Sequence, residues 1–197
     1  MQHLEKVQFK YAPRFLGIDK KGREILSYIE GEVPRGVTFS IEQLIACAKM
    51  LRAFHDAAAH SDLCGQEETL CHNDFAPWNI IFRDNSPAGI IDFDDCQPGK
   101  RIEDMAYFLW TFLELGNPVI ATKEQLEKIA LLRQVYQLET THSLASVLLQ
   151  QQERILIFRR AKANNELDEV KRAFSADAVK RIQVEICLLY TSDAADE

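Results

Sequence analysis

Apolar and polar positions alternate in two short runs near the start of the chain. The runs cover residues 14–18 and 24–29, and a turn containing Gly22 separates them. Alternation on either side of such a turn is typical of a β-hairpin. Residues 30–38 contain two glycines and a proline and break the pattern, so they are expected to connect this β part to the rest of the chain.

Helical periodicity begins at residue 41. Ser40 followed by Gln43 has the spacing of a capping box, which satisfies free backbone N–H groups at the start of a helix. The pattern predicts a helix over residues 41–60. Apolar residues recur on one face of this helix every three or four positions: Ile41, Leu44, Ile45, Ala48, Leu51 and Phe54.

Short apolar runs return at residues 70–82 and 88–93, on either side of the turn-forming segment 83–87. This arrangement predicts a second β-hairpin. The sequence as a whole predicts an α+β fold in which helices predominate. Four further helices are expected over residues 104–116, 122–136, 143–162 and 166–185, the second of them capped by Thr122 with Gln125.

The composition is that of a folded protein. The chain has 197 residues, of which 47% are hydrophobic, enough for one domain or for most of a two-lobed one. No apolar run reaches the length of about eighteen residues that a membrane span needs. The first residues lack the features of a signal peptide, so a cytoplasmic protein is expected. Five cysteines without paired spacing argue against a disulfide framework or a zinc site.

The net charge is −7. This charge disfavours a nucleic-acid partner, because phosphate groups require basic surfaces. It would suit a small cationic ligand. No feature of the sequence predicts a membrane partner, and the oligomeric state is not indicated.

A polar cluster stands directly before the second hairpin, at His72, Asn73, Asp74 and Asn79. A hairpin brings its two outer ends together, so Asn79 and Asp92 are expected to face one point. Their oxygen atoms suit Mg²⁺, a hard cation that is usually bound by carboxylates and phosphate. Asp74 is then placed to accept a proton from a hydroxyl group. Taken alone, the same residues could form an ordinary polar turn that caps a strand.

Two segments resemble one known family. Residues 72–79 (HNDFAPWN) resemble the H-x-D-x-x-x-x-N loop of the aminoglycoside phosphotransferase and choline kinase-like family, and residues 91–107 (IDFDDCQPGKRIEDMAY) resemble its following I-D segment. The spacing is similar to that of the catalytic and metal-binding loops of protein kinases. The resemblance implies a protein-kinase-like fold with a mostly helical C-lobe and a remnant N-lobe hairpin. It also implies Mg²⁺ and ATP as cofactors, with GTP as the alternative nucleotide.

The resemblance assigns roles to eight residues and leaves the substrate-binding residues unknown. They are the catalytic base Asp74, the Mg²⁺ ligands Asn79 and Asp92, the catalytic-loop supports His72 and Asp104, and the hinge residues Ser27, Tyr28 and Ile29, whose backbone groups would bind adenine.

The resemblance also divides the chain into three parts. Residues 1–33 correspond to the end of an N-lobe and its hinge, and residues 34–186 to a C-lobe. Residues 187–197 resemble translated sequencing-adapter DNA and are expected to be a non-native tail. The Gly-rich hairpin, strand lysine and helix glutamate of the family are not found before residue 14. We therefore expect a fragment cut at both ends that is a poor or inactive catalyst, since phosphoryl transfer depends on positioning and charge stabilisation.

The implied reaction is transfer of the γ-phosphoryl group of ATP to a hydroxyl group of a small molecule, with an aminoglycoside antibiotic as the first candidate. Choline-like alcohols, sugars, macrolides and homoserine-like metabolites are alternative acceptors. A non-catalytic pseudokinase is a second class, which the missing lysine would fit. A phosphohydrolase built on Asp92, Asp94 and Asp95 is a third, but the downstream lysine and acidic motif that it needs are not found in the expected order.

Overall fold

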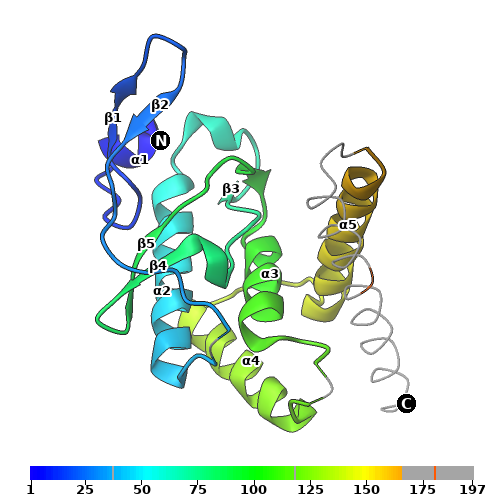
Figure 1. The fold of residues 1–197 in the computed structure, drawn as a ribbon. Helices are drawn as coiled ribbons and strands as arrows, with labels where there is room; N and C mark the ends of the chain where they lie inside the picture. Colours follow the sequence, from blue (N-terminus) through cyan, green and yellow to red (C-terminus); the bar gives the residue numbers. More distant parts are fainter. Residues whose placement is uncertain (37, 118, 166–179, 181–197) are drawn as a thin grey trace.

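The computed structural model describes residues 1–36, 38–117, 119–165 and 180. Figure 1 shows a mainly helical body with a small β-hairpin at one edge, so the expected α+β class is confirmed. The strands within the described residues form three two-stranded antiparallel sheets, β1–β2, β3–β6 and β4–β5. The elements are the helices α1 (Gln2–Lys6), α2 (Ile41–Ala58), α3 (Arg101–Leu113), α4 (Thr122–Tyr136) and α5 (Leu144–Asn165), and the strands β1 (Phe15–Ile18), β2 (Glu24–Leu26), β3 (Thr69–Cys71), β4 (Ile80–Arg83), β5 (Ser86–Ile90) and β6 (Gln97–Gly99).

Strands β1 and β2 form the first predicted hairpin. Strand β2 ends at Leu26, three residues earlier than predicted. The last pairing is made by Ser27, whose N–H donates to the Arg14 carbonyl oxygen (2.9 Å) and whose hydroxyl accepts the Arg14 N–H (2.8 Å). Beyond Ser27 the chain leaves the hairpin and enters the connector.

Helix α2 begins where the sequence predicts. The Ser40 hydroxyl accepts the Gln43 N–H (3.3 Å), and the Gln43 side chain accepts the Ser40 N–H (2.9 Å), which completes the capping box. The helix ends at Ala58, two residues before the predicted end. Its buried face carries Leu44, Cys47, Ala48, Leu51 and Phe54.

Strands β4 and β5 form the second predicted hairpin. Its turn is shorter than the predicted segment 83–87, because Asp84 and Asn85 alone link the strands with φ angles of 50° and 60°. Two successive left-handed residues suit the twist of a two-stranded hairpin, and Asp and Asn tolerate that conformation. At the other end, the Ile91 N–H donates to the Asn79 carbonyl oxygen (3.0 Å). The outer ends of the hairpin therefore lie side by side.

The pairing of β3 with β6 was not predicted. Each strand has only three residues, too few to show alternation, and Pro98 and Gly99 resemble turn residues. Gly99 is needed because a Cβ atom there would lie 2.9 Å from the Cys71 Sγ atom. Strand β3 leads into the polar loop that starts at His72, and β6 follows the polar segment that ends at Cys96. Their pairing therefore holds the start of the first segment next to the end of the second.

The four longer helices pack in pairs, α2 against α4 and α3 against α5. The predicted cap of α4 is wrong: Ala121 precedes the helix and no side chain caps it. Gln125 is instead buried, and its amide donates to the carbonyl oxygens of Leu113 (3.0 Å) and Glu114 (3.2 Å), which are free because α3 ends there. The predicted helix 166–185, apart from residue 180, and the predicted tail 187–197 lie outside the described residues.

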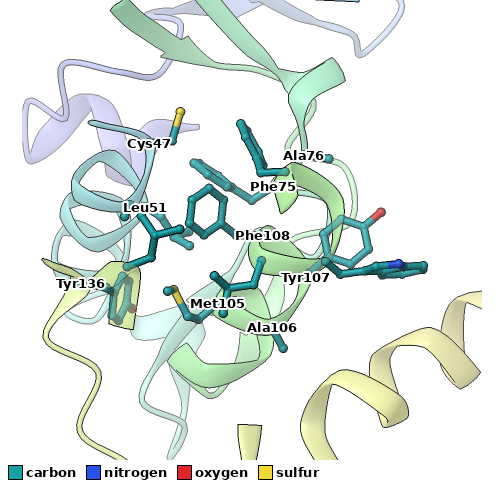
Figure 2. Packing of buried hydrophobic residues seen from close by; sticks show 14 of the residues in the cluster. Cys47, Leu51, Phe75, Ala76, Met105, Ala106, Tyr107, Phe108 and Tyr136 are labelled. Carbon is teal, nitrogen blue, oxygen red and sulfur yellow. The ribbon is translucent and has the colours of Figure 1, made fainter. Parts of the chain in front are cut away.

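The main core lies between α2, α3 and α4 and includes the loop after β3. Figure 2 shows Leu51 of α2 and Phe108 of α3 packed with Phe75 of that loop, while Tyr136 enters from α4. The rings of Phe75 and Phe108 meet edge to face, with centroids 5.8 Å apart. The polar loop is therefore fixed to the core by its own apolar residue. Within the described residues, no helix is both long and apolar enough to cross a bilayer.

The connector after β2 is attached to β4 by a close backbone contact. Glu32 and Phe82 exchange two N–H to carbonyl hydrogen bonds of 2.8 Å. Gly31 has a φ of 140°, and a Cβ atom there would lie 2.4 Å from the Phe82 carbonyl oxygen. No side chain fits at this position without a backbone shift.

We expect Gly31→Ala to lower the free energy of unfolding by about 1–3 kcal/mol, the usual range for overpacking. Gly17→Ala is the matched control, because Gly17 has nearly the same φ, 142°, but no atom within 4 Å of its Cβ position. Urea unfolding of both variants measures the difference. Equal losses would show that backbone strain, and not the contact with Phe82, sets the requirement for glycine.

Candidate active site

Asp104 of α3 fixes the backbone of the polar loop. One of its carboxylate oxygens accepts the N–H of His72 (2.6 Å), and the other accepts the N–H of Asn73 (2.8 Å). The side chain is 1% exposed. Hydrogen bonds to a charged acceptor are stronger than neutral ones, so a rigid helix holds the start of the loop in place.

The support continues through α2 to α4. The Nε2 atom of His55 bonds to Asp104 (2.9 Å), and its Nδ1 atom contacts the hydroxyl group of Tyr136. Burial alone would raise the pKa of Asp104, but the interactions with His55 and His72 together outweigh this effect and hold that pKa below its usual value. Asp104 is therefore ionised, and three helices meet behind the loop.

His72 connects the two polar loops. Its Nε2 atom lies 3.1 Å from the Ile91 carbonyl oxygen, and its Nδ1 atom accepts the Asp74 N–H (3.3 Å). A neutral ring protonated on Nε2 satisfies both contacts. These contacts favour the supporting role predicted for His72 over a role in proton transfer.

Burial lowers the pKa of His72 below its ordinary value of 6.5. The unfolded chain therefore takes up a proton near pH 6.5 while the folded chain does not. His72 thus contributes stability that is present above that value and is lost as the pH falls below it toward the folded pKa. We expect NMR titration of the imidazole signals to give a midpoint for His72 below 6.5. A midpoint at or above 6.5 would contradict the buried neutral ring.

The carboxylate of Asp74 receives three hydrogen bonds. The hydroxyl group of Tyr107 donates to Oδ1 (2.7 Å), and the Nδ2 amide of Asn79 donates to Oδ2 (2.7 Å). The indole Nε1 of Trp78 lies 3.3 Å and 3.2 Å from the same two oxygens. These contacts hold the half-buried carboxylate in one orientation.

The sequence patterns alone do not reveal the contacts of Tyr107 and Trp78 with Asp74. A signal for each was present. Tyr107 lies three residues after Asp104 and so shares its helix face. Trp78 lies four residues after Asp74 and belongs to a short 3₁₀ helix, Pro77–Asn79.

Asn79 and Asp92 offer oxygen atoms that fit a magnesium ion. The amide nitrogen of Asn79 is turned toward Asp74, so its side-chain carbonyl oxygen is the atom that could bind a metal ion. Asp92 follows Ile91, the residue that bonds to the Asn79 backbone, and has a left-handed φ of 63°. Its side chain is exposed and, among the described residues, has no hydrogen-bond or ion-pair partner. Hard oxygen ligands of this kind are those that Mg²⁺ prefers.

Asn73 links this region to α5, a second connection that the sequence did not reveal. Its side chain donates to the Asp95 carbonyl oxygen (2.9 Å) and accepts a hydrogen bond from Arg154 of α5 (3.1 Å). Its φ is 63°, a conformation that Asn adopts more readily than most residues. The segment that contains the predicted metal ligand Asp92 and helix α5 therefore both contact the residue next to Asp74.

The predicted hinge lies beside β5. The Ile29 side chain packs on Gly89, where a Cβ atom would lie only 2.6 Å from Ile29 Cδ1. The backbone N–H of Ser27 already donates to Arg14, so of the predicted hinge groups the Ser27 carbonyl and the backbone groups of Tyr28 and Ile29 could serve a nucleotide.

A buried group of His55, Cys71 and Asp104 has metal-ligand types within 4.8 Å of one another. Its atoms are already used, because His55 bonds to Asp104 and the Cys71 thiol donates to the Lys100 carbonyl oxygen (3.2 Å). Burial raises the pKa of Cys71 far above that of a free thiol, which disfavours the thiolate form. This group serves as structural support.

Comparison with known proteins decides the family. A model of the phosphotransferase enzyme family, APH, matches residues 2–138, more than half of the chain. The chain belongs to this family. The resemblance carried by residues 72–79 and 91–107 is therefore confirmed.

A curated relative of this phosphotransferase-family chain is the trifolitoxin immunity protein of Rhizobium leguminosarum bv. trifolii, which is 31% identical over 147 residues. The alignment covers 66% of the chain and 56% of the relative. The chain thus spans little more than half the length of this relative.

Solved structures show the same fold. A protein from Ralstonia eutropha JMP134, provisionally described as an aminoglycoside phosphotransferase, superposes with a TM-score of 0.66 at 11% identity, over 96% of this chain and 82% of its own. The gentamicin-APH(2")-IIa complex gives 0.56 at 17% identity, over 94% and 79%. The ADP-bound aminoglycoside phosphotransferase APH(2'')-Ib gives 0.51 at 16% identity, over 95% and 80%. At these identities the likeness concerns the fold, which is protein-kinase-like as the sequence predicted.

Proposed function

We propose that this family member transfers the γ-phosphoryl group of ATP to a hydroxyl group of a small molecule, with an aminoglycoside as the first acceptor to test. One observation carries the proposal. The Asn79 amide nitrogen holds the Asp74 carboxylate, while its oxygen is left beside the segment that contains Asp92. A proton acceptor and two residues with metal-type oxygen atoms thus lie on adjacent segments, which supports a role in phosphoryl transfer.

Asp74 acts as the base in the proposed reaction. The acceptor oxygen forms a bond to the γ-phosphorus, the bond from that phosphorus to the β,γ-bridging oxygen breaks, and ADP leaves with the electron pair. The hydroxyl proton passes to Asp74, which Tyr107 and Asn79 hold in position. Mg²⁺ held by Asn79 and Asp92 would neutralise phosphate charge. Holding these groups in place supplies most of the catalysis in such reactions.

Two observations bear on the acceptor. Asp92, Asp94 and Asp95 are exposed on one short segment beside the site, and carboxylates attract cationic groups such as amines. The name of the Rhizobium relative states immunity to trifolitoxin. Its 31% identity to this chain favours a second candidate role, protection against that toxin. Expression of the chain in strains sensitive to gentamicin or to trifolitoxin separates these two roles.

A coupled assay of ADP formation tests the function. Aminoglycosides, choline, sugars, a macrolide and homoserine are supplied in turn with ATP and Mg²⁺, and we expect one class to accelerate ADP formation in a reaction that EDTA stops. Because we expect this chain to be slow, the rates are compared with the same chain without acceptor. Tight Mg-ATP binding with no ADP from any acceptor would favour the pseudokinase alternative instead.

The metal ligands have a separate test. We expect Asp92→Ala to weaken binding of Mg-ATP by about tenfold or more, since a hydrated Mg²⁺ ion relies on one or two protein carboxylates. Isothermal titration calorimetry measures this change, with Asp62→Ala as a control for loss of an exposed carboxylate elsewhere. Unchanged affinity in Asp92→Ala would show that the ligand assignment is wrong.

A further inference from the structure

The contact between Trp78 and Asp74 differs from the other two contacts of that carboxylate. The hydrogen bonds from Tyr107 and Asn79 are both 2.7 Å and come from residues that are 5% and 4% exposed. The indole N–H of Trp78 is shared between both oxygens at 3.3 Å and 3.2 Å, and this side chain is 49% exposed. Trp78 therefore makes the longest hydrogen bonds to Asp74 and is the most exposed of its three donors. Its indole can move away without disturbing the core.

An acceptor needs the place that this indole occupies. A group whose proton passes to Asp74 has to form a hydrogen bond to one of its oxygens. Two contacts of the carboxylate come from the buried residues Tyr107 and Asn79, and the third comes from the exposed indole of Trp78. Water and an alcohol present the same O–H group to a base, so a carboxylate that is open to solvent also activates water.

We propose that Trp78 covers the base until an acceptor alcohol displaces it, and that it thereby keeps water from attacking ATP. This inference rests on the proposed function. The reaction that Trp78 suppresses is a hydrolysis. The water oxygen forms a bond to the γ-phosphorus, one water proton passes to Asp74, and the bond to the β,γ-bridging oxygen breaks to release ADP and phosphate. An alcohol with the rest of a substrate behind it has further contacts with which to displace the indole, whereas water has none.

Two measurements on the whole chain test this inference. The first is the rate of phosphate release from Mg-ATP without any acceptor. We expect Trp78→Phe, which keeps a ring but removes the N–H donor, to raise this rate about tenfold, the order of one hydrogen bond to a charged group. The double variant Asp74→Asn/Trp78→Phe is expected to return to the wild-type rate or below it, because the additional hydrolysis requires the base.

The second measurement does not depend on turnover. The chain has two tryptophans, so its ¹H–¹⁵N spectrum contains two indole N–H signals, and the signal lost in Trp78→Phe belongs to Trp78. We expect Asp74→Ala to shift this signal toward that of free indole and to accelerate its exchange with water. Circular dichroism checks that each variant is folded.

The outcomes separate the inference from the proposed function. Unchanged phosphate release in Trp78→Phe overturns the inference, even if wild-type chain phosphorylates an acceptor. An indole signal that is insensitive to Asp74→Ala also overturns it, because the covering contact is then absent. If the indole signal of Trp78 responds to Asp74→Ala but the chain does not bind Mg-ATP, the proposed function is rejected. The protective role of Trp78 is then rejected with it.

Discussion

Asp74→Asn is expected to reduce kcat for phosphoryl transfer by about 10²–10⁴-fold, the usual contribution of a general base. The substituted amide has nearly the same shape as the carboxylate and keeps an oxygen for the hydrogen bond from Tyr107, but it cannot take up the acceptor proton. The predicted metal ligands Asn79 and Asp92 are unchanged. The affinity for Mg-ATP should therefore remain close to that of the wild-type chain.

Kinetic assays of wild-type chain and Asp74→Asn, with nucleotide binding measured in parallel, test this expectation. Asp62→Asn removes an exposed carboxylate outside the site and is expected to leave kcat unchanged. Full kcat in Asp74→Asn would reject Asp74 as the base. An equal loss of kcat and nucleotide affinity would indicate damage to the loop and not the loss of a proton acceptor.

Asp104→Asn is expected to lower the free energy of unfolding by about 3–5 kcal/mol, the usual cost of removing one partner from a buried charged pair. The new amide directs N–H groups at a position where His72 and Asn73 already donate N–H groups, and where His55 bonds as well. At least one of these buried donors loses its acceptor, which is costly away from water.

Urea unfolding measures this loss, and Asp56→Asn is the matched control. Asp56 also pairs with basic groups, Arg52 and Arg101, but its side chain is 51% exposed. Exposed pairs contribute about 0–1 kcal/mol, so the control variant should lose little. Similar losses in both variants would show that the burial of Asp104 does not make its interactions stronger than exposed ones.

The low pKa of Asp104 also predicts how the free energy of unfolding depends on pH. The stabilising contribution of Asp104 is present above its unfolded pKa of 3.8 and is lost as the pH falls through the folded pKa.

The elements with strong local signals could be predicted from the sequence. Helix α2 carries a capping box and a regular apolar face, and the β4–β5 hairpin has alternating strands around turn-forming residues. The placement of Asn79 beside Ile91 follows from that hairpin alone. These features depend on neighbours in the sequence, which is why a single sequence reveals them.

Features that depend on distant residues could not be predicted. Gln125 has the spacing of a capping residue, but in the folded chain it reaches the free carbonyl groups at the end of α3. The β3–β6 pair joins residues far apart in the sequence through strands of three residues each. Arg154 contacts Asn73 across 81 residues, and no local pattern marks either one as a partner of the other.

The most direct test of the account is the fate of a labelled phosphoryl group. The chain is incubated with Mg-ATP that carries ¹⁸O on the γ-phosphoryl group, with gentamicin as the acceptor, and the products are analysed by mass spectrometry. We predict gentamicin that carries the labelled phosphoryl group in the wild-type reaction and not in the Asp74→Asn reaction. Labelled phosphate in solution with unmodified gentamicin, or labelled product of equal amount from Asp74→Asn, would contradict the account.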